Sequence, residues 1–115
     1  MAIDYQRRIW VADTGNNRIQ RFNQYGQFEL WFGSYGQGGG QFNQPNSIAI
    51  DGSGWVYVLD AGNNRVQIFD DALHRIGILP LNVTRAQHLE VDRDRLYVVD
   101  SGSHRILIYK IRRKR

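Results

Sequence analysis

The sequence predicts an all-β chain built from repeated four-stranded antiparallel sheets. A seven-residue motif occurs three times, at 13–19, 60–66 and 100–106. Each copy is flanked by short runs in which β-branched and aromatic residues alternate with polar ones, a pattern typical of strands. No stretch shows the 3.6-residue apolar period of an amphipathic helix. The length of 115 residues is that of one ordinary domain.

The repeated motif joins an Asp to an Arg that follows five residues later. DTGNNRI returns as DAGNNRV and, less closely, as DSGSHRI, at spacings of 47 and 40 residues. Around each copy lie further apolar runs, so that the first two units have four predicted strands and the third has three. The predicted strands are 2–4, 9–12, 19–22 and 28–32, then 48–51, 55–59, 66–69 and 75–79, then 89–92, 96–99 and 106–109.

Four antiparallel strands in a repeat of roughly 40–45 residues are typical of a β-propeller blade. We therefore expect an incomplete propeller over residues 1–111, followed by a basic tail at 112–115. The expected blades are blade one at 2–33, blade two at 47–80 and blade three at 88–111.

The motif and the glycine-rich connector at 32–51 closely resemble the NHL repeat. The resemblance covers essentially the whole chain, in two full copies and one shortened copy. The third copy departs from the pattern, because Ser103 and His104 replace the Asn pair. The resemblance implies a propeller of six blades, and it is far more specific for the repeat family than for any function.

Residues that recur in every copy are expected to build the blade, because an active site is needed only once. The Asp and Arg of each motif bracket a hairpin turn and are expected to form a forked ion pair. The Gly and Asn residues are expected to stabilise the turn. Positive φ is favourable for the glycines, and the left-handed conformation is tolerated by Asn16, Asn17, Asn63 and Asn64. The ion-pair residues are Asp13, Arg18, Asp60, Arg65, Asp100 and Arg105, and the turn residues are Gly15, Asn16, Gly62, Asn63 and Gly102.

Fewer than three complete blades cannot close a propeller, which needs roughly four to eight. At about 25 cal/mol per Å², two uncovered apolar blade faces forfeit on the order of 10 kcal/mol, comparable to the stability of a whole domain. We therefore expect closure to about six blades by homodimerisation, unless the chain is a fragment of a longer propeller or engineered from one. The leading functional hypothesis is a non-enzymatic scaffold that assembles with itself and binds another protein or peptide.

Non-repeated residues are the candidates for partner contacts, because Tyr, Trp and Arg are enriched at binding hot spots. Trp31 and Phe42 are instead expected to pack the seam between blades. The remaining candidates for partner binding are Tyr25, Tyr35, Arg7, Arg8 and Arg21.

The sequence does not favour catalysis or a cofactor. There is no Cys to act as a nucleophile or thiolate ligand, and no Ser stands in a nucleophile-elbow pattern. The glycine-rich stretch at 33–40 lacks the ending of a phosphate-binding loop. His88 is a weak metal candidate near the central channel, where lyases with a similar propeller place metal-binding His, but zinc needs three or four ligands. A metal-dependent lyase stays as an alternative.

The basic character of the chain comes from its end. The net charge is +4, which Arg112, Arg113, Lys114 and Arg115 supply, while the remaining residues carry equal numbers of acidic and basic side chains. RNA binding through this tail is a second alternative, against which the neutral body argues. We expect a soluble chain without a signal peptide or membrane-spanning segment, and the sequence does not fix its compartment.

Overall fold

The computed structural model describes residues 1–112, and its strands form three antiparallel sheets. The all-β prediction is confirmed. Blade one comprises β1 (Ala2–Ile3), β2 (Ile9–Asp13), β3 (Arg18–Phe22) and β4 (Phe28–Phe32). Blade two comprises β5 (Pro45–Ile50), β6 (Val56–Asp60), β7 (Arg65–Phe69) and β8 (Arg75–Pro80). Blade three comprises β9 (Ala86–Asp92), β10 (Arg95–Asp100) and β11 (Arg105–Lys110).

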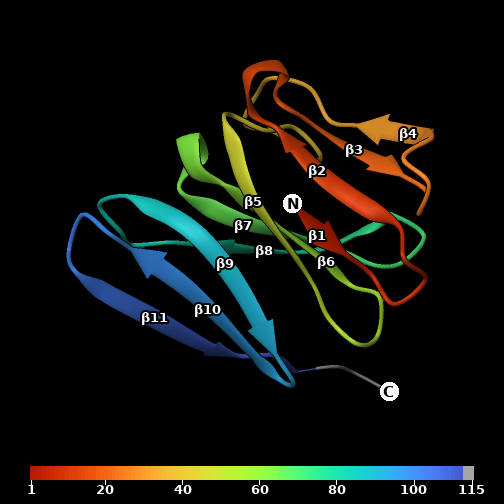
Figure 1. The fold of residues 1–115 in the computed structure, drawn as a ribbon. Helices are drawn as coiled ribbons and strands as arrows, with labels where there is room; N and C mark the ends of the chain where they lie inside the picture. Colours follow the sequence, from red (N-terminus) through yellow and green to blue (C-terminus); the bar gives the residue numbers. More distant parts are fainter. Residues whose placement is uncertain (113–115) are drawn as a thin grey trace.

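The three sheets stand side by side as the blades of a partial propeller (Figure 1). Within each blade the strands follow chain order, and each pairs antiparallel with the next. The first strands of the blades adjoin one another, because β5 contacts both β1 and β9. The chain therefore runs outward through each blade and returns to the inside of the arc through a connector.

The seam between blades one and two is closed by aromatic residues. Phe42 of the connector is fully buried, and its ring lies edge-on to those of Phe32 and Phe69, with centroids 6.1 and 6.2 Å away. Phe42 packs the seam, as predicted. Trp31 is 54% exposed and packs in neither of the two seams formed within residues 1–112. Successive side chains of a strand point to opposite faces, and Trp31 points away from the seam that its neighbour Phe32 helps to fill.

The seam between blades two and three is built from aliphatic residues. Tyr57, Leu59 and Val66 of blade two pack with Leu96 and Val98 of blade three, and all five are buried. Blade two thus buries both of its faces. Blades one and three each bury one face within the part of the chain that the structure describes.

The turns of the first two motifs are short 3-10 helices, η1 (Thr14–Asn16) and η2 (Ala61–Asn63). In the three motifs positive φ falls at Asn17, Asn64 and His104, with values of 54°, 55° and 53°. The left-handed conformation expected of the motif Asn residues is thus confirmed at Asn17 and Asn64, whereas positive φ at the motif glycines is wrong. A 3-10 turn keeps its first residues right-handed and reverses at the residue that ends it.

Two of the motif glycines are needed for a different reason, which is the close approach of a connector. A Cβ atom on Gly62 would lie 2.5 Å from Cγ of Asn43, and one on Gly102 would lie 2.8 Å from Cβ of Thr84. A Cβ atom on Gly15, in blade one, would have no such neighbour within 4 Å among residues 1–112. The first motif therefore has open space where the other two meet a connector.

Candidate interaction surfaces

The Asp–Arg pair of blade two forms a buried polar corner. Asp60 is fully buried, and its Oδ2 accepts hydrogen bonds from Arg65 Nε at 2.8 Å, Asn63 Nδ2 at 3.0 Å and Gln67 Nε2 at 3.3 Å. The pairing follows from the hairpin, because Asp60 and Arg65 are register partners at the ends of β6 and β7. Ionised hydrogen bonds of this kind are the strong ones in proteins.

The same corner fastens the connector that arrives from blade one. Asp60 Oδ1 accepts a hydrogen bond from the backbone N–H of Asn43 at 2.7 Å. Arg65 donates from Nη1 to the carbonyl oxygen of Gln37 and from Nη2 to that of Gly38, both at 2.9 Å. The pair therefore joins two blades as well as two strands.

Blade three repeats this arrangement with different connector residues. Asp100 Oδ1 accepts from the backbone N–H of Arg85 at 2.9 Å, and its Oδ2 accepts from Arg105 Nε at 3.2 Å. Arg105 Nη2 donates to the carbonyl oxygen of Asn82 at 2.6 Å. Each Arg thus meets the carboxylate through Nε and turns its outer nitrogens to the connector. The predicted Asp–Arg ion pairs therefore form in all three motifs, but through one guanidinium nitrogen and not as a two-pronged fork.

The corner of blade one has no connector among residues 1–112. Asp13 accepts hydrogen bonds from the side chains of Arg18 (2.8 Å), Gln20 (3.0 Å) and Asn16 (3.1 Å). The guanidinium of Arg18 lies over the ring of Trp31, at 5.3 Å from its centroid. Blade one therefore has the same Asp and Arg that in blades two and three hydrogen-bond to the connector from the preceding blade.

These contacts lower the pKa of two of the motif carboxylates. Hydrogen bonds from Arg18 and then Asn16 hold the pKa of Asp13 below its ordinary value. The backbone N–H of Arg85 lowers the pKa of Asp100 to about 2, with a further contribution from Thr84, against the opposing effect of burial. Both groups are therefore charged at neutral pH.

The lowered pKa of Asp100 predicts acid sensitivity. An unfolded Asp titrates near 3.9, so the stabilisation is complete above about pH 4 and is lost as the pH falls toward 2. We expect the melting temperature, followed by circular dichroism, to fall across this range. In Asp100→Asn the melting temperature should start lower at pH 7 and fall less. An equally steep fall in that variant would contradict the assignment.

Two of the five expected partner-binding residues are engaged inside blade one. Arg8 donates from Nε to Asp4 at 2.8 Å, and Arg21 donates from Nε to Glu29 at 2.8 Å. Both guanidinium groups lie over the ring of the buried Trp10, at 5.9 and 5.3 Å from its centroid. A partner that used either residue would compete with these internal contacts.

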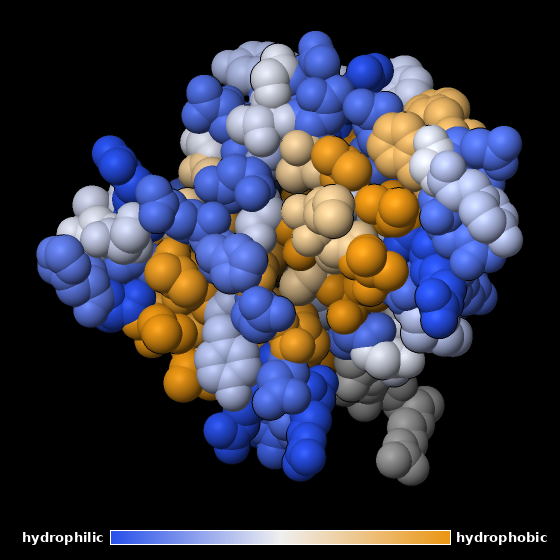
Figure 2. Space-filling model, in the orientation of Figure 1, coloured by the Kyte–Doolittle hydropathy of each residue, from blue (hydrophilic) through white to orange (hydrophobic). Residues whose placement is uncertain are grey.

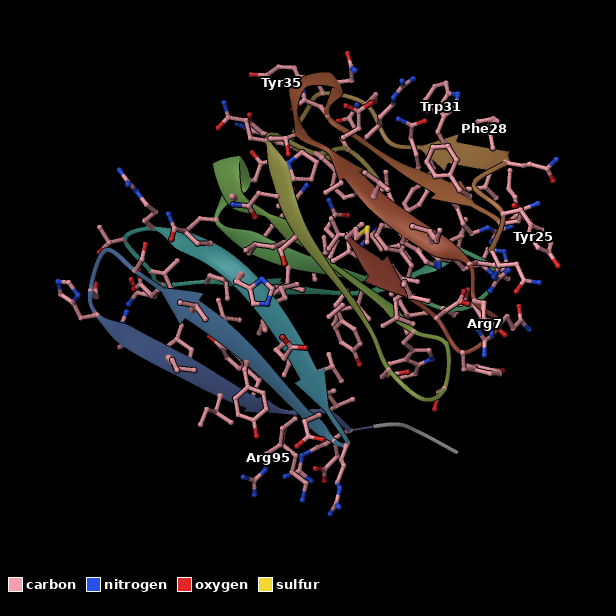
Figure 3. All side chains as sticks on the ribbon, in the orientation of Figure 1. Arg7, Tyr25, Phe28, Trp31, Tyr35 and Arg95 are labelled. Atoms are coloured by element: carbon pink, nitrogen blue, oxygen red, sulfur yellow. The ribbon has the colours of Figure 1, made fainter. Side chains whose placement is uncertain are left out.

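The other three expected partner-binding residues are exposed but do not form one patch. Tyr25 and Arg7 lie in the β3–β4 and β1–β2 turns, at one end of blade one, whereas Tyr35 lies in the connector at the opposite end (Figure 3). Tyr25 is 80% exposed and Tyr35 is 69% exposed. The structure therefore offers two separate aromatic positions on the two ends of the blade.

His88 lies on β9, the first strand of blade three, between two polar neighbours. Its Nδ1 is 3.5 Å from Ser47 Oγ of β5, and its Nε2 is 3.1 Å from Glu90 Oε2. Within residues 1–112 no three His, Cys, Asp or Glu side chains gather closely enough to hold a metal ion. The same residues contain no helix with the length and apolar character needed to cross a bilayer.

Both outer blade faces carry exposed apolar side chains, among them Ile3, Ile106 and Ile108. Figure 2 shows apolar side chains gathered over blade three and around β1 and β2, with polar residues between them. On blade one, the register places Ile3, Ile9, Val11 and Phe22 on the face turned away from blade two. On blade three, the register places Tyr97, Val99, Ile106 and Ile108 together on the face turned away from blade two.

Each outer face has the residue positions that form one side of an existing seam. The outer face of blade one matches the side that faces the preceding blade, and the outer face of blade three matches the side that faces the next blade. By the motif spacing, Ile9, Val11 and Phe22 occupy the positions of Val56, Val58 and Phe69, which blade two buries against blade one. In the same way, the exposed face of blade three occupies the positions that blades one and two turn toward the next blade. The residues at those positions are Trp10, Ala12 and Ile19 in blade one and Tyr57, Leu59 and Val66 in blade two.

The fold and its repeated corners define an NHL-like partial β-propeller. The chain belongs to the family described as "6-bladed beta-propeller", which matches residues 3–106. A curated relative is Protein brain tumor of Drosophila melanogaster, which is 42% identical over 50 residues. That match covers 44% of this chain and 5% of the relative, so the chain spans a small part of that protein's length.

Solved propellers are similar to the chain in structure at low sequence identity. A chain of a nidogen/laminin complex superposes with a TM-score of 0.71 and 16% identity, over 89% of this chain and 37% of that one. Streptogramin B lyase superposes with a TM-score of 0.70 and 14% identity, over 96% of this chain and 39% of that one. At such identities the likeness concerns the fold, and this chain spans well under half of each neighbour.

Proposed function

We propose that this chain is a non-enzymatic scaffold, two copies of which associate through their outer blade faces into a closed six-bladed ring that binds another protein or peptide. The observation that carries the proposal is the match between the two outer faces and the two sides of the existing seams. An apolar face that is rimmed by polar residues marks an interaction site.

The geometry of a six-bladed ring fits two copies of a three-blade chain. Three blades cover half a turn, so a second copy rotated by half a turn brings blade three of each copy against blade one of the other. A closed arrangement with twofold symmetry is the commonest form of homo-oligomer. The six blades of the family description support this count.

The polar residues of the described chain support a binding role over a catalytic one. The motif carboxylates Asp60 and Asp100 are fully buried and are used by strands and connectors. Tyr25, Tyr35 and Arg7 remain exposed at the two ends of blade one. Aromatic and Arg side chains dominate the energetics of protein interfaces, and these ends are where we expect a partner protein or peptide.

Cysteine cross-linking tests the contact between blade three of one copy and blade one of the other, because the unsubstituted chain contains no Cys. We expect a mixture of Val11→Cys and Ile106→Cys chains to give a covalent dimer with a short bis-maleimide. Neither variant alone should do so, because each face meets the other kind of face. Replacing Val11→Cys by Ala72→Cys, on an exposed turn of blade two, is the matched control. Equal cross-linking of each variant with itself would contradict the proposal.

A further inference from the structure

Among residues 1–112, the last strand of blade three has one edge that no other strand pairs with. In blades one and two the third strand pairs on both sides, with the second strand and with an outer strand. In blade three, β11 pairs only with β10 among residues 1–112. A strand edge of this kind presents a row of backbone N–H and C=O groups to any chain that can pair with it.

An apolar groove lies beside this edge, where an outer strand would cover it. Its volume is about 260 Å³, and it runs between blade two and blade three. Ile68, Gly77 and Leu79 line it from blade two, and Leu96, Tyr109 and Ile111 line it from blade three. The free edge and the groove together make a site for an extended segment with side chains at alternate positions.

The sister blades show how such a segment is held. In blade one, Phe22 pairs with Phe28 and Ile19 pairs with Phe32. By the motif spacing, Tyr109 and Ile106 of β11 occupy the positions of Phe22 and Ile19. An added antiparallel strand therefore begins opposite Tyr109 and ends opposite Ile106.

The positive charge beside the β11 edge indicates which peptide sequences would bind there. The residues that precede the added strand lie beside the end of β11, where Lys110 and Arg112 are both exposed. Arg112 also lines the groove.

We infer that the edge of β11 binds an extended peptide as a fourth, antiparallel strand, and that this peptide carries alternating apolar residues preceded by acidic ones. The inference specifies the kind of partner for the binding role proposed above. It does not require ring closure, because β11 is the outermost strand of its sheet and its edge is distinct from the blade faces.

The test uses a peptide with the sequence of residues 27–33 and two added Asp at its N-terminus, titrated into the full chain by calorimetry. We expect binding in the micromolar range and slower hydrogen exchange at the β11 amides. Methylating the peptide's backbone nitrogens on the pairing side should weaken binding about tenfold or more, because each lost hydrogen bond contributes about 1 kcal/mol. Equal affinity of the methylated peptide would overturn the inference.

A charge exchange tests the acidic requirement separately. Replacing the two added Asp by Lys should weaken binding about fivefold, as expected for exposed ion pairs. The double variant Lys110→Glu, Arg112→Glu should reverse this preference and bind the lysine peptide better. Identical preferences in the unsubstituted chain and the double variant would contradict the charge assignment.

Two further results would overturn the inference while leaving ring closure untouched. One is the absence of binding, with a normal cross-linked dimer in the cysteine experiment. The other is full protection of the β11 edge amides before any peptide is added, because the edge would then already be paired. Conversely, peptide binding by a chain that fails to cross-link would reject ring closure and keep the strand site.

Discussion

Replacing Asp60 by Ala is expected to lower the free energy of unfolding by about 3–5 kcal/mol, as for other broken buried ion pairs. The carboxylate is fully buried and accepts from Arg65, Asn63, Gln67 and the backbone of Asn43. Removing it leaves buried donors without an acceptor, and such groups incur their full desolvation penalty. Urea unfolding followed by tryptophan fluorescence, at fixed protein concentration, measures the change.

The chain contains its own control for this substitution. Asp13 occupies the same motif position, but its side chain is 21% exposed and that of its partner Arg18 is 32% exposed. In the monomeric chain, Asp13→Ala is therefore expected to lower the free energy of unfolding by at most about 1 kcal/mol, as for solvent-accessible pairs. Similar losses at the two positions would show that fastening the connector adds little to stability.

The strands and the Asp–Arg pairs were predictable because they depend on local pattern. Alternation of apolar residues marks each strand, and a turn of fixed length makes Asp60 and Arg65 register partners. The partner atoms on the connector were not predictable, because they are the backbone N–H of Asn43 and the backbone carbonyl of Gln37. Almost every residue has these groups, so residue type does not reveal which of them will be used. Only the fold shows which backbone groups arrive at the corner.

Which side of a strand faces a neighbouring blade was also not predictable from residue type. Trp31 was expected in a seam and is exposed, whereas Arg8 and Arg21 were expected at a surface and lie against Trp10. A long Arg side chain packs its stem on an aromatic ring as readily as it reaches solvent. Of the five expected partner-binding residues, Arg7, Tyr25 and Tyr35 therefore remain as candidates.

A lysine on either outer face is expected to dissociate the proposed dimer. Val11→Lys and Ile106→Lys each place a charge where the closed ring buries apolar side chains, and burying an unpaired charge costs several kcal/mol. We expect each variant to weaken association about 100-fold or more, which corresponds to about 2.7 kcal/mol. Sedimentation velocity over a dilution series measures the change.

The matched control is Ala72→Lys, which adds the same charge on an exposed turn of blade two and should leave association unchanged. Mixing Val11→Glu with Ile106→Lys should restore part of the lost affinity, since opposite charges then meet at one of the two interfaces. If Ala72→Lys dissociates the dimer equally, the effect comes from net charge and not from the blade faces.

The mass of the unsubstituted 115-residue chain in solution tests the central claim most directly. Sedimentation equilibrium at micromolar concentration should give twice the chain mass of 13.4 kDa, as expected for two half-rings. A stable mass of 13.4 kDa across that range would contradict it, because the outer faces of blades one and three would then be tolerated in water without a partner.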